Sequence, residues 1–321
     1  METLAGGSSS VDRRLPAVVA NPSNLANPTA LRILITRVCA ELGWAPPLWL
    51  ETTVEDPGCG QTQIALSAGA DVVIACGGDG TVRHVAQVLA GSGTPMGLLP
   101  AGTANLLARN LSMTIGDPAK ATRIALSGYN RAIDVGRILI DNQGDEHVFL
   151  VMAGLGFDAA IMAGTPHELK ARLGSLAYFV SGFRALTAPR SGITLVVDGR
   201  VEPCRPVRTV VVGNCGKLLA GLVLLPAARI DDGLLDVVSI GPKSIHGWLA
   251  VAARVITRRR RGHRIVQHWQ GRTVIISTES AQHAQLDGDP VGEVQTLRMR
   301  IDPGALLIRV PRSTPTVAAN A

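Results

Sequence analysis

The sequence predicts an α/β domain with a parallel sheet, followed by a β-rich domain built as an antiparallel sandwich or barrel. Short apolar runs alternate with helical patterns from residue 15 to about residue 130, and longer β-rich runs follow over residues 131–311. No Gly/Ser-rich linker separates the two parts, so we expect them to pack directly and to form a cleft. We expect residues 1–14 and 312–321 to be disordered ends.

The first domain alternates strands with helices, and this order implies βαβ units whose parallel sheet is covered on both faces. Each expected strand is a short apolar run, and the strands are Ala17–Ala20, Pro47–Leu50, Asp71–Cys76 and Met96–Leu99. Each expected helix places apolar residues on one face. These helices are Thr29–Leu42, Gln61–Ala68, Val82–Ala90, Ala104–Asn110 and Pro118–Leu126.

The second domain consists of β-rich runs interrupted by two helical patterns, which is typical of an antiparallel sandwich or barrel with a few helices. The expected strands are Ala132–Ile140, Val148–Ala153, Ile193–Val197, Val207–Val212, Leu235–Ile240, Arg264–Trp269, Thr273–Ser277, Thr296–Ile301 and Leu306–Val310. The expected helices are Leu173–Leu186 and Ser244–Thr257.

Composition narrows the class of partner. Of the 321 residues, 46% are apolar and 17% are charged, which is enough to bury a sizeable interior. Aromatic residues make up only 3%, so stacking platforms for bases are scarce and a single-strand nucleic-acid binder is disfavoured. The formal net charge of +6 favours anionic partners such as nucleotides or phospholipid surfaces.

Cysteine usage and hydropathy bear on the compartment. The five cysteines are odd in number and form no C-x-x-C pair, so neither a disulfide framework nor a zinc site is indicated, and a reducing cytosol is expected. The first residues lack the apolar core of a signal peptide, and the longest apolar run, Leu218–Leu225, is far shorter than a membrane span. We expect a cytoplasmic protein that docks peripherally on the inner face of the membrane.

Three glycines mark the turn between an expected strand and an expected helix, in the segment Gly77-Gly78-Asp79-Gly80-Thr81. Glycines let backbone N–H groups approach a ligand closely, and the helix start adds its positive dipole end, so phosphate is the expected guest. Thr81 could cap the helix or bind a phosphate oxygen. Neither G-x-x-x-x-G-K-[ST] nor G-x-G-x-x-G occurs in the chain, which disfavours the two nucleotide-binding folds that use them.

Asp79 is the informative residue of this turn. A carboxylate beside phosphates is repelled unless it binds Mg²⁺ or takes a proton from the attacking hydroxyl. Asp79 therefore indicates chemistry rather than passive binding. The alternative is a tight turn in which Asp79 caps its helix.

Gly77–Thr81 resembles the GGDGT signature shared by diacylglycerol kinases, sphingosine kinases and NAD kinases, with a related form in 6-phosphofructokinases. Leu98–Asn105 is similar to the second nucleotide loop of the diacylglycerol kinase family, in its bacterial lipid-kinase branch. Alone, each motif would also fit an ordinary βα loop. The resemblance spans about residues 15 to 311 with four ordered motifs. It implies an NAD kinase/diacylglycerol kinase-like fold and transfer of the γ-phosphoryl of ATP to a lipid hydroxyl, with diacylglycerol the first candidate.

The resemblance also implies contacts with the nucleotide. Asn21-Pro22 is similar to the family's first contact, although the Ser-Gly that commonly follows reads Ser23-Asn24 here. The family has a Thr near the nucleotide after the second strand, where we choose Thr53 over Thr52; a polar strand end is the alternative. The implied nucleotide-binding residues are Asn21, Pro22, Thr53, Gly77, Gly78, Asp79, Gly80, Thr81, Gly102 and Thr103.

An acid-rich turn precedes the expected strand Leu235–Ile240. It resembles the family's Mg²⁺-binding turn, which implies that the Asp232 carboxylate and the main-chain oxygens of Arg229 and Leu234 bind a structural Mg²⁺. Carboxylate and carbonyl oxygens are the ligands that hard cations prefer. A solvated Asp-Gly turn is the alternative.

The segment Leu286-Asp287-Gly288-Asp289-Pro290 resembles the family's L-D-G-[acid] segment, whose acidic residue accepts the proton of the lipid hydroxyl. The resemblance implies Asp289 as this base. Many relatives have Glu there, so the shorter Asp needs the hydroxyl about one methylene closer. A hairpin turn would also explain Asp-Gly at this place. Whether Asp289 or Asp79 takes the proton stays open.

Several features have two interpretations. The run Arg258–Arg261 either forms a solvated face or holds the cleft against anionic headgroups. Arg83 and His84 either neutralise phosphate or lie on a wet helix face. NAD kinase and a non-catalytic lipid- or nucleotide-binding protein are the alternatives to a lipid kinase. No nucleic-acid-binding motif is recognised. The sequence names neither the lipid nor the oligomeric state, for which a homodimer is one option.

Overall fold

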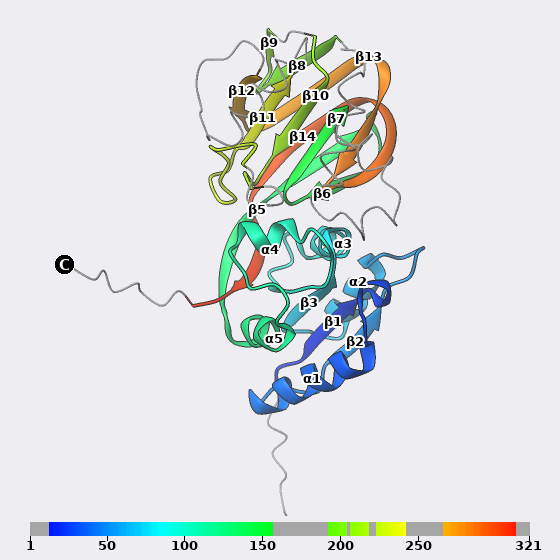
Figure 1. Ribbon diagram of the computed structural model, residues 1–321, viewed down its shortest axis with the longest axis vertical. Coiled ribbons are helices and arrows are strands. Elements are labelled where there is room, and N and C mark those ends of the chain that lie inside the picture. The colour runs from blue at the N-terminus through cyan, green and yellow to red at the C-terminus, as the bar shows by residue number, and fades with distance from the viewer. Residues whose placement is uncertain (1–12, 157–191, 204–205, 218–222, 242–265, 313–321) are drawn as a thin grey trace, which may run out of the picture.

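The computed structural model describes residues 13–156, 192–203, 206–217, 223–241 and 266–312. They form two lobes, an α/β lobe from the first part of the chain and a β-rich lobe above it (Figure 1). The described strands belong to one continuous hydrogen-bonded sheet that runs through both lobes.

The sheet of the α/β lobe contains parallel strands in the order β2-β1-β3-β4. These strands are β1 (Pro16–Ala20), β2 (Leu48–Glu51), β3 (Val72–Gly77) and β4 (Met96–Pro100). Successive side chains of a strand point to opposite faces. Ala17 and Val19 accordingly join one buried cluster, whereas Val18 joins another. Helices must therefore cover both faces of this sheet.

The helices divide between the two faces, since α1 contacts α5 and α2 contacts α3. The helices are α1 (Pro28–Glu41), α2 (Cys59–Ser67), α3 (Asp79–Leu89), α4 (Leu106–Asn110) and α5 (Pro118–Ser127), with a short 3₁₀ turn, η1 (Pro22–Asn24), after β1.

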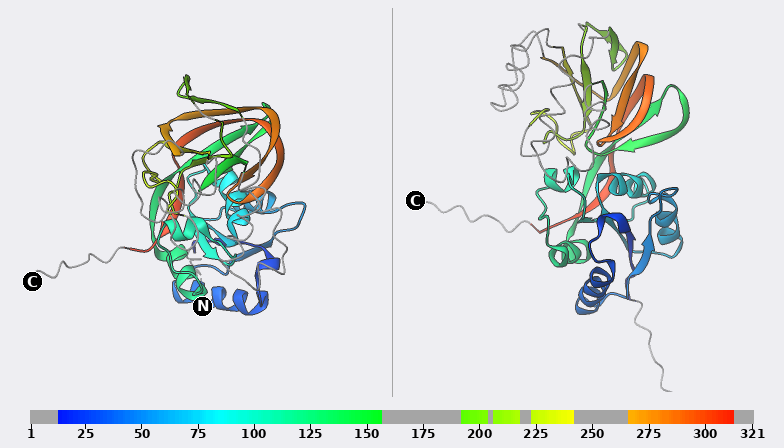
Figure 2. Two further views of the ribbon diagram at one scale, coloured as in Figure 1. Left: turned by 45° about the horizontal axis from the view of Figure 1, so that its top comes forward. Right: turned by 45° about the vertical axis from the view of Figure 1, so that its right-hand side comes forward.

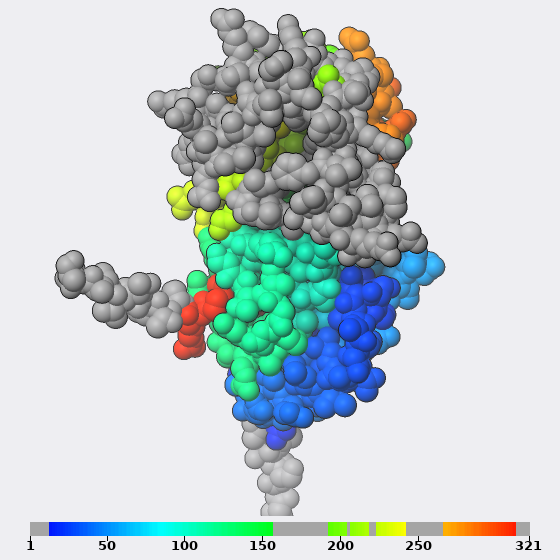
Figure 3. Space-filling model, viewed as in Figure 1, coloured from blue at the N-terminus to red at the C-terminus, as the bar shows by residue number. Residues whose placement is uncertain are grey.

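Local sequence explains where α1 and α5 begin. The side chains of Asn27 and Asp117 accept hydrogen bonds from the N–H groups of Ala30 and Lys120, at 2.9 Å in both cases. Each cap is followed by a proline in the first helical turn, where the missing N–H costs nothing. In the space-filling view, α1 (blue) and α5 (green) lie side by side on the surface of the α/β lobe (Figure 3).

Antiparallel strands build the β-rich lobe, in the order β12-β11-β10-β7-β13-β14, while β5 pairs with β14 and β6, and β8 pairs with β13 and β9. The strands are β5 (Tyr129–Ile140), β6 (Gln143–Phe149), β7 (Met152–Gly156), β8 (Ile193–Val197), β9 (Arg200–Glu202), β10 (Thr209–Gly213), β11 (Leu235–Ile240), β12 (Val266–Gly271), β13 (Thr273–Leu286) and β14 (Asp289–Val310). Their inward side chains form a separate core that includes Phe149, Leu195 and Val237.

Strands β5 and β14 connect the two lobes. β14 pairs with β13 and β5 in the β-rich lobe, and its Ile308 then pairs in parallel with Met96 of β4. Figures 1 and 2 show β5 in green and β14 in red running together from one lobe into the other. Residues from the far end of the described chain therefore complete the sheet of the α/β lobe.

The predicted fold class is confirmed. Among the strands, β9 was not expected, β13 extends beyond Ser277 to Leu286, and two further differences concern how the expected strands divide or join. The expected strand Val148–Ala153 is divided between β6 and β7, because the Asp287 carboxylate takes up the N–H groups of residues 150 to 152 at the junction. The expected strands Thr296–Ile301 and Leu306–Val310 are both parts of β14, which continues through an irregularity between them.

Other expectations concern residues outside the described ranges, namely the helices Leu173–Leu186 and Ser244–Thr257, the basic run Arg258–Arg261 and most of the apolar run Leu218–Leu225. Within the described ranges, no helix is long and apolar enough to cross a bilayer. The described cysteines are free thiols.

Candidate active site

The carboxyl ends of three parallel strands bring the first predicted residues together. Asn21 follows β1 and its N–H donates to the Cys76 carbonyl at 2.9 Å, while Pro22 begins η1. Ala101 follows β4 and its N–H donates to the Gly77 carbonyl at 2.9 Å. Hydrogen bonding thus continues past the strand ends, and the three loops start side by side. This edge is where open α/β sheets bind ligands.

The two glycine loops are in backbone contact. A Cβ on Gly102 would lie 2.5 Å from the Cα of Gly78, and a Cβ on Gly77 would lie 2.5 Å from Oγ1 of Thr81. Neither position has room for a side chain. Thr81 is buried, and its hydroxyl lies 3.5 Å from the amide nitrogen of Asn21. The loops form a compact backbone surface at the start of α3, which suits phosphate.

Asp79 is the first residue of α3, yet its carboxylate does not cap that helix. Its Oδ1 instead accepts a hydrogen bond from the N–H of Leu106 at 2.6 Å, so the Asp79 carboxylate, at the start of α3, binds the first N–H of α4. The alternative in which Asp79 caps its own helix is wrong. Burial, followed by the negative charge of Asp287, raises the pKa of Asp79 to about 6.

Asn105 organises the second glycine loop from a left-handed backbone conformation, with φ of 48°. Its side chain accepts from the N–H of Gly102 at 3.1 Å and donates to the carbonyl of the same residue at 2.7 Å. Thr103, a predicted nucleotide contact, is exposed on this loop. The prediction omits Asn105, although the tolerance of Asn for left-handed conformations is a signal that could have found it.

Thr53 lies on the exposed turn after β2. Its N–H donates to the Asp56 carbonyl at 3.0 Å, and its Oγ1 accepts from the N–H of Asp56 at 3.0 Å. Thr52 is buried and donates its N–H to the Ala20 carbonyl at 2.9 Å. Thr53 is therefore the accessible one of the two threonines.

Asp289 comes to the glycine turn from the opposite lobe. It begins β14, directly after a two-residue hairpin loop in which Asp287 and Gly288 have φ of 51° and 94°. Its Oδ2 accepts a hydrogen bond from Nη2 of Arg83 at 3.0 Å. A Cβ on Gly80 would lie 2.8 Å from the same oxygen. The segment forms the hairpin turn that the sequence allowed, and this turn places the carboxylate of Asp289 against the glycine turn.

Asp287 is a buried member of this site that the prediction did not assign. Its carboxylate accepts three hydrogen bonds, from the N–H groups of Leu150 and Val151 at 2.8 Å and of Met152 at 2.9 Å. Burial raises the pKa of Asp287, although these hydrogen bonds oppose the rise. The sequence places Asp287 in the recognised segment, but nothing in the pattern shows that its partners lie on the β6–β7 junction.

The acidic turn before β11 is held against β5. Asp134 of β5 accepts from the N–H of Gly233 at 2.6 Å and from that of Gly304 at 2.8 Å. Asp232 is exposed, and its Oδ1 accepts from the N–H of Leu234 at 3.1 Å. Burial raises the pKa of Asp232, and the Asp134 carboxylate acts in the same direction.

The Asp134 and Asp232 carboxylates repel each other. A hard cation bound at the turn would offset this repulsion, so the turn is compatible with the predicted ion. The described part of the chain holds no cluster of three or more His, Cys, Asp or Glu side chains suited to a metal. The fit therefore depends on one carboxylate with main-chain oxygens, as the predicted set of Arg229, Asp232 and Leu234 assumes.

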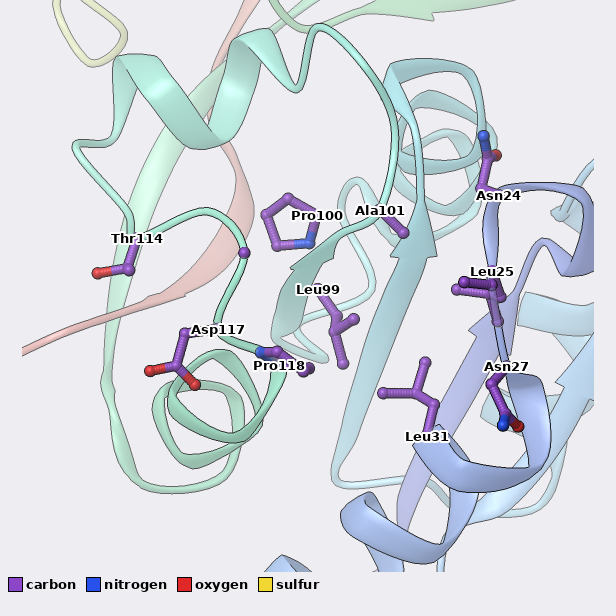
Figure 4. Close-up of a pocket in the computed structure, with 12 residues that line it drawn as sticks. Asn24, Leu25, Asn27, Leu31, Leu99, Pro100, Ala101, Thr114, Asp117 and Pro118 are labelled. Atoms are coloured by element: carbon purple, nitrogen blue, oxygen red, sulfur yellow. The ribbon is translucent and has the colours of Figure 1, made fainter.

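A cavity of about 220 Å³ lies on the face of the α/β sheet that α1 and α5 cover, between the starts of these two helices. Leu25, Leu31, Leu99 and Pro100 surround it (Figure 4). The residues that line it include none of the predicted nucleotide contacts. Neither Asp79 nor Asp289 lines this cavity.

Two regions of the chain match known domains. Residues 50–138 match the diacylglycerol kinase catalytic domain. Residues 151–310 match the YegS C-terminal NAD kinase beta sandwich-like domain. The first match contains both glycine loops, and the second contains Asp287 and Asp289.

Curated relatives carry lipid kinase names. A diacylglycerol kinase of Mycobacterium tuberculosis is 35% identical over 174 residues, which cover 54% of this chain and 56% of that protein. A probable lipid kinase YegS-like of Pseudomonas aeruginosa is 34% identical over 259 residues, which cover 78% of this chain and 80% of that protein. The match thus spans about half the length of the first relative and most of the second.

Solved structures show the same fold at low identity. A diacylglycerol kinase from Bacillus anthracis has a TM-score of 0.73 at 20% identity, covering 95% of this chain and 99% of that one. An NAD kinase from Archaeoglobus fulgidus has a TM-score of 0.51 at 12% identity, covering 92% and 94%. Such identities show the fold alone.

The two lobes and their glycine loops define a protein with the fold common to NAD kinases and diacylglycerol kinases. With the relatives above, the chain belongs to the diacylglycerol kinase catalytic-domain family of lipid kinases, which includes the YegS-like proteins.

Proposed function

We propose that this protein transfers the γ-phosphoryl group of ATP to the hydroxyl of a lipid in a Mg²⁺-dependent reaction, with diacylglycerol the first acceptor to test. The observation that carries the proposal is the meeting of Asp79 and Asp289, from opposite lobes, at one glycine turn. A binding protein needs phosphate-binding backbone but has no use for two acids beside it.

The residues divide into two roles. The loops at Gly77–Thr81 and Gly102–Thr103 would bind the phosphates through backbone N–H groups and the start of α3. The β-rich lobe would bind the lipid and present its hydroxyl to the phosphates. Asp289 is the better candidate for the proton acceptor, because its side chain is 49% exposed, whereas Asp79 is only partly exposed and its Oδ1 accepts from the N–H of Leu106.

Mg²⁺, when bound, supplies positive charge that neutralises the oxygens of the transferred group. Asp79 is the residue that would hold the nucleotide's Mg²⁺, since a buried carboxylate with a raised pKa gains most from a nearby cation. A second, structural ion would be held at Asp232 with the main-chain oxygens of Arg229 and Leu234. The A. fulgidus NAD kinase of the same fold was solved in complex with ATP, which supports ATP as the nucleotide.

The proposed location in the cell follows from the proposed lipid acceptor. A lipid acceptor requires the protein to work at a membrane surface, and the net charge of +6 favours an anionic one. We therefore place the protein in the cytoplasm, in peripheral contact with the inner face of the membrane.

The test is phosphoryl transfer from γ-labelled ATP with Mg²⁺ to a panel of lipids in mixed micelles, with NAD as a soluble control. Label in a lipid supports the proposal and identifies the acceptor. Label in NADP would move the protein to the NAD kinases. No label in any acceptor, with ATP still bound, would leave a binding protein as the better description.

Variants of the two acids test their roles. We expect Asp79→Asn and Asp289→Asn each to lower transfer at least about 100-fold, which is typical of a lost proton acceptor or lost charge stabilisation. Circular dichroism should show both variants folded. Asp198→Asn is the matched control, because Asp198 lies in another Asp-Gly hairpin turn of the β-rich lobe and is exposed. Full activity in either acid variant would remove that residue from the mechanism.

A further inference from the structure

We propose that Arg83 is a positioning residue that holds the Asp289 carboxylate against the glycine turn, a role that rests on the proposed kinase function. Arg83 lies one helical turn after Asp79 on α3, and it is buried rather than on a wet helix face. Its Nη2 donates to Oδ2 of Asp289 at 3.0 Å, across 206 positions of sequence. This ion pair joins the α/β lobe directly to the acid of the β-rich lobe.

Burial alone cannot fix Asp289. Its side chain is 49% exposed, and it follows immediately after a tight hairpin loop. An exposed Asp samples several rotamers, whereas a proton acceptor must lie within hydrogen-bond distance of the attacking hydroxyl. The side chain of Arg83 is 9% exposed and its guanidinium is planar, so it provides a fixed donor, and no other described side chain donates to Asp289.

The charges around Arg83 also support its role in positioning Asp289. Asp79, Asp287 and Asp289 bring three carboxyl groups to one place, and the charge of Arg83 favours the ionised form of buried Asp287. His84 does not share this task, because burial and then the charge of Arg83 lower its pKa. Among the described residues, Arg83 is therefore the cation that opposes repulsion between the carboxylates of the two lobes.

Arg83 is held at a cost that a purely structural residue would avoid. Its Nε is buried and has no hydrogen-bond partner among the residues that the structure describes. A buried donor without a partner destabilises the folded state, and an apolar side chain of similar length would remove this penalty. The ion pair that Nη2 makes with Asp289 offsets this penalty.

Three variants test the role through steady-state kinetics on the acceptor that the lipid panel identifies. Arg83→Met keeps the length of the side chain without its charge, and Arg83→Lys keeps the charge with a single donor group. Arg137→Met is the matched control, because it removes the 2.8 Å ion pair between Arg137 and Asp302, which joins β5 to β14 elsewhere.

We expect Arg83→Met to lower kcat about 100-fold, the cost of a misplaced catalytic group, while KM for ATP changes less than about threefold. Arg83→Lys should recover part of kcat, and Arg137→Met should match the wild type. In an Asp289→Asn background, Arg83→Met should have little further effect, because the carboxylate to be positioned is gone. A large rise in KM for ATP with kcat preserved would instead make Arg83 a phosphate-binding residue and overturn the proposal.

A crystal structure of Arg83→Met separates this inference from the proposed function. We expect the Asp289 carboxylate to leave its place beside Gly80 while the backbone of the two lobes stays unchanged. This result needs no turnover, so it tests positioning even if the lipid panel takes up no label. An Asp289 side chain that remains beside Gly80 in the variant would refute the role.

Discussion

Burial and the neighbouring carboxyl group of Asp287 both raise the pKa of Asp79. The folded state holds this proton more tightly than the unfolded chain, since the pKa rises from 3.8 to about 6. Well below pH 4 both states carry the proton, so this group costs the fold nothing. Between about pH 4 and pH 6 the unfolded chain loses the proton while the folded state keeps it, so the stability falls over this range and levels off above it.

This linkage gives a stability prediction for Asp79→Asn, which keeps an oxygen for the Leu106 N–H. We expect the variant to gain, relative to the wild type, up to about 3 kcal/mol of unfolding free energy at pH 7.5 compared with pH 4, because each pKa unit corresponds to about 1.4 kcal/mol. Urea unfolding of both proteins at the two pH values measures it. An identical difference at both pH values would show that the carboxyl is not perturbed in the ligand-free fold.

Some site residues could be found from sequence and others could not, and the reason is the range of their contacts. Asp79 and Asp289 stand in recognisable motifs, so their positions were predicted and the structure brings them to one turn. Asp287 and Arg83 act through partners more than a hundred positions away. Their neighbouring residues give no sign of such partners, because a buried arginine and an exposed one look alike in a helical pattern.

At the scale of elements, the glycine loops depend on close backbone packing. Gly102→Ala would place a methyl group 2.5 Å from the Cα of Gly78. We expect this change to lower the free energy of unfolding by about 1–3 kcal/mol, the usual cost of overpacking, and to weaken ATP binding. Chemical denaturation and ATP titration measure the two effects.

The control for this change is Gly192→Ala. Gly192 is exposed, and a Cβ there would have no atom within 4 Å. It should leave both stability and ATP affinity near those of the wild type. If Gly102→Ala behaved in the same way, the contact between the two loops would not be a constraint on the site.

Several strands and helices of the α/β lobe were predicted well because their signals are local. For example, Asn27 and Asp117 are N-cap residues, and each is followed by a proline in the first turn of its helix. The break between β6 and β7 had no such signal, because an apolar run continues through residues 148 to 153 and only the Asp287 carboxylate interrupts the pairing. Long-range hydrogen bonds, rather than local propensity, set that boundary.

On the scale of the whole molecule, the sheet of the α/β lobe includes a strand, β14, that comes from the β-rich lobe. Ile308 of β14 is fully buried and pairs with Met96 of β4. We expect a fragment of residues 13–130 to remain unfolded or aggregate, because it lacks β14 and most of β5 and leaves β4 as an unpaired apolar edge. Circular dichroism and thermal unfolding, with residues 13–312 as the comparison, measure this. A cooperative transition in the short fragment would show that the lobe folds independently.

The crossing of β5 and β14 also limits how the two lobes can move. Hinges between lobes are often a few loop residues, but here the paired strands β5 and β14 run from one lobe into the other. Asp134 of β5 accepts from the N–H of Gly304, in the irregular section of β14, and from that of Gly233. A pair of hydrogen-bonded strands yields more easily by twisting than by bending across its hydrogen bonds. Movement of the two lobes would then be a small torsion about the strand axis, which slides Asp289 past the glycine turn instead of lifting it away.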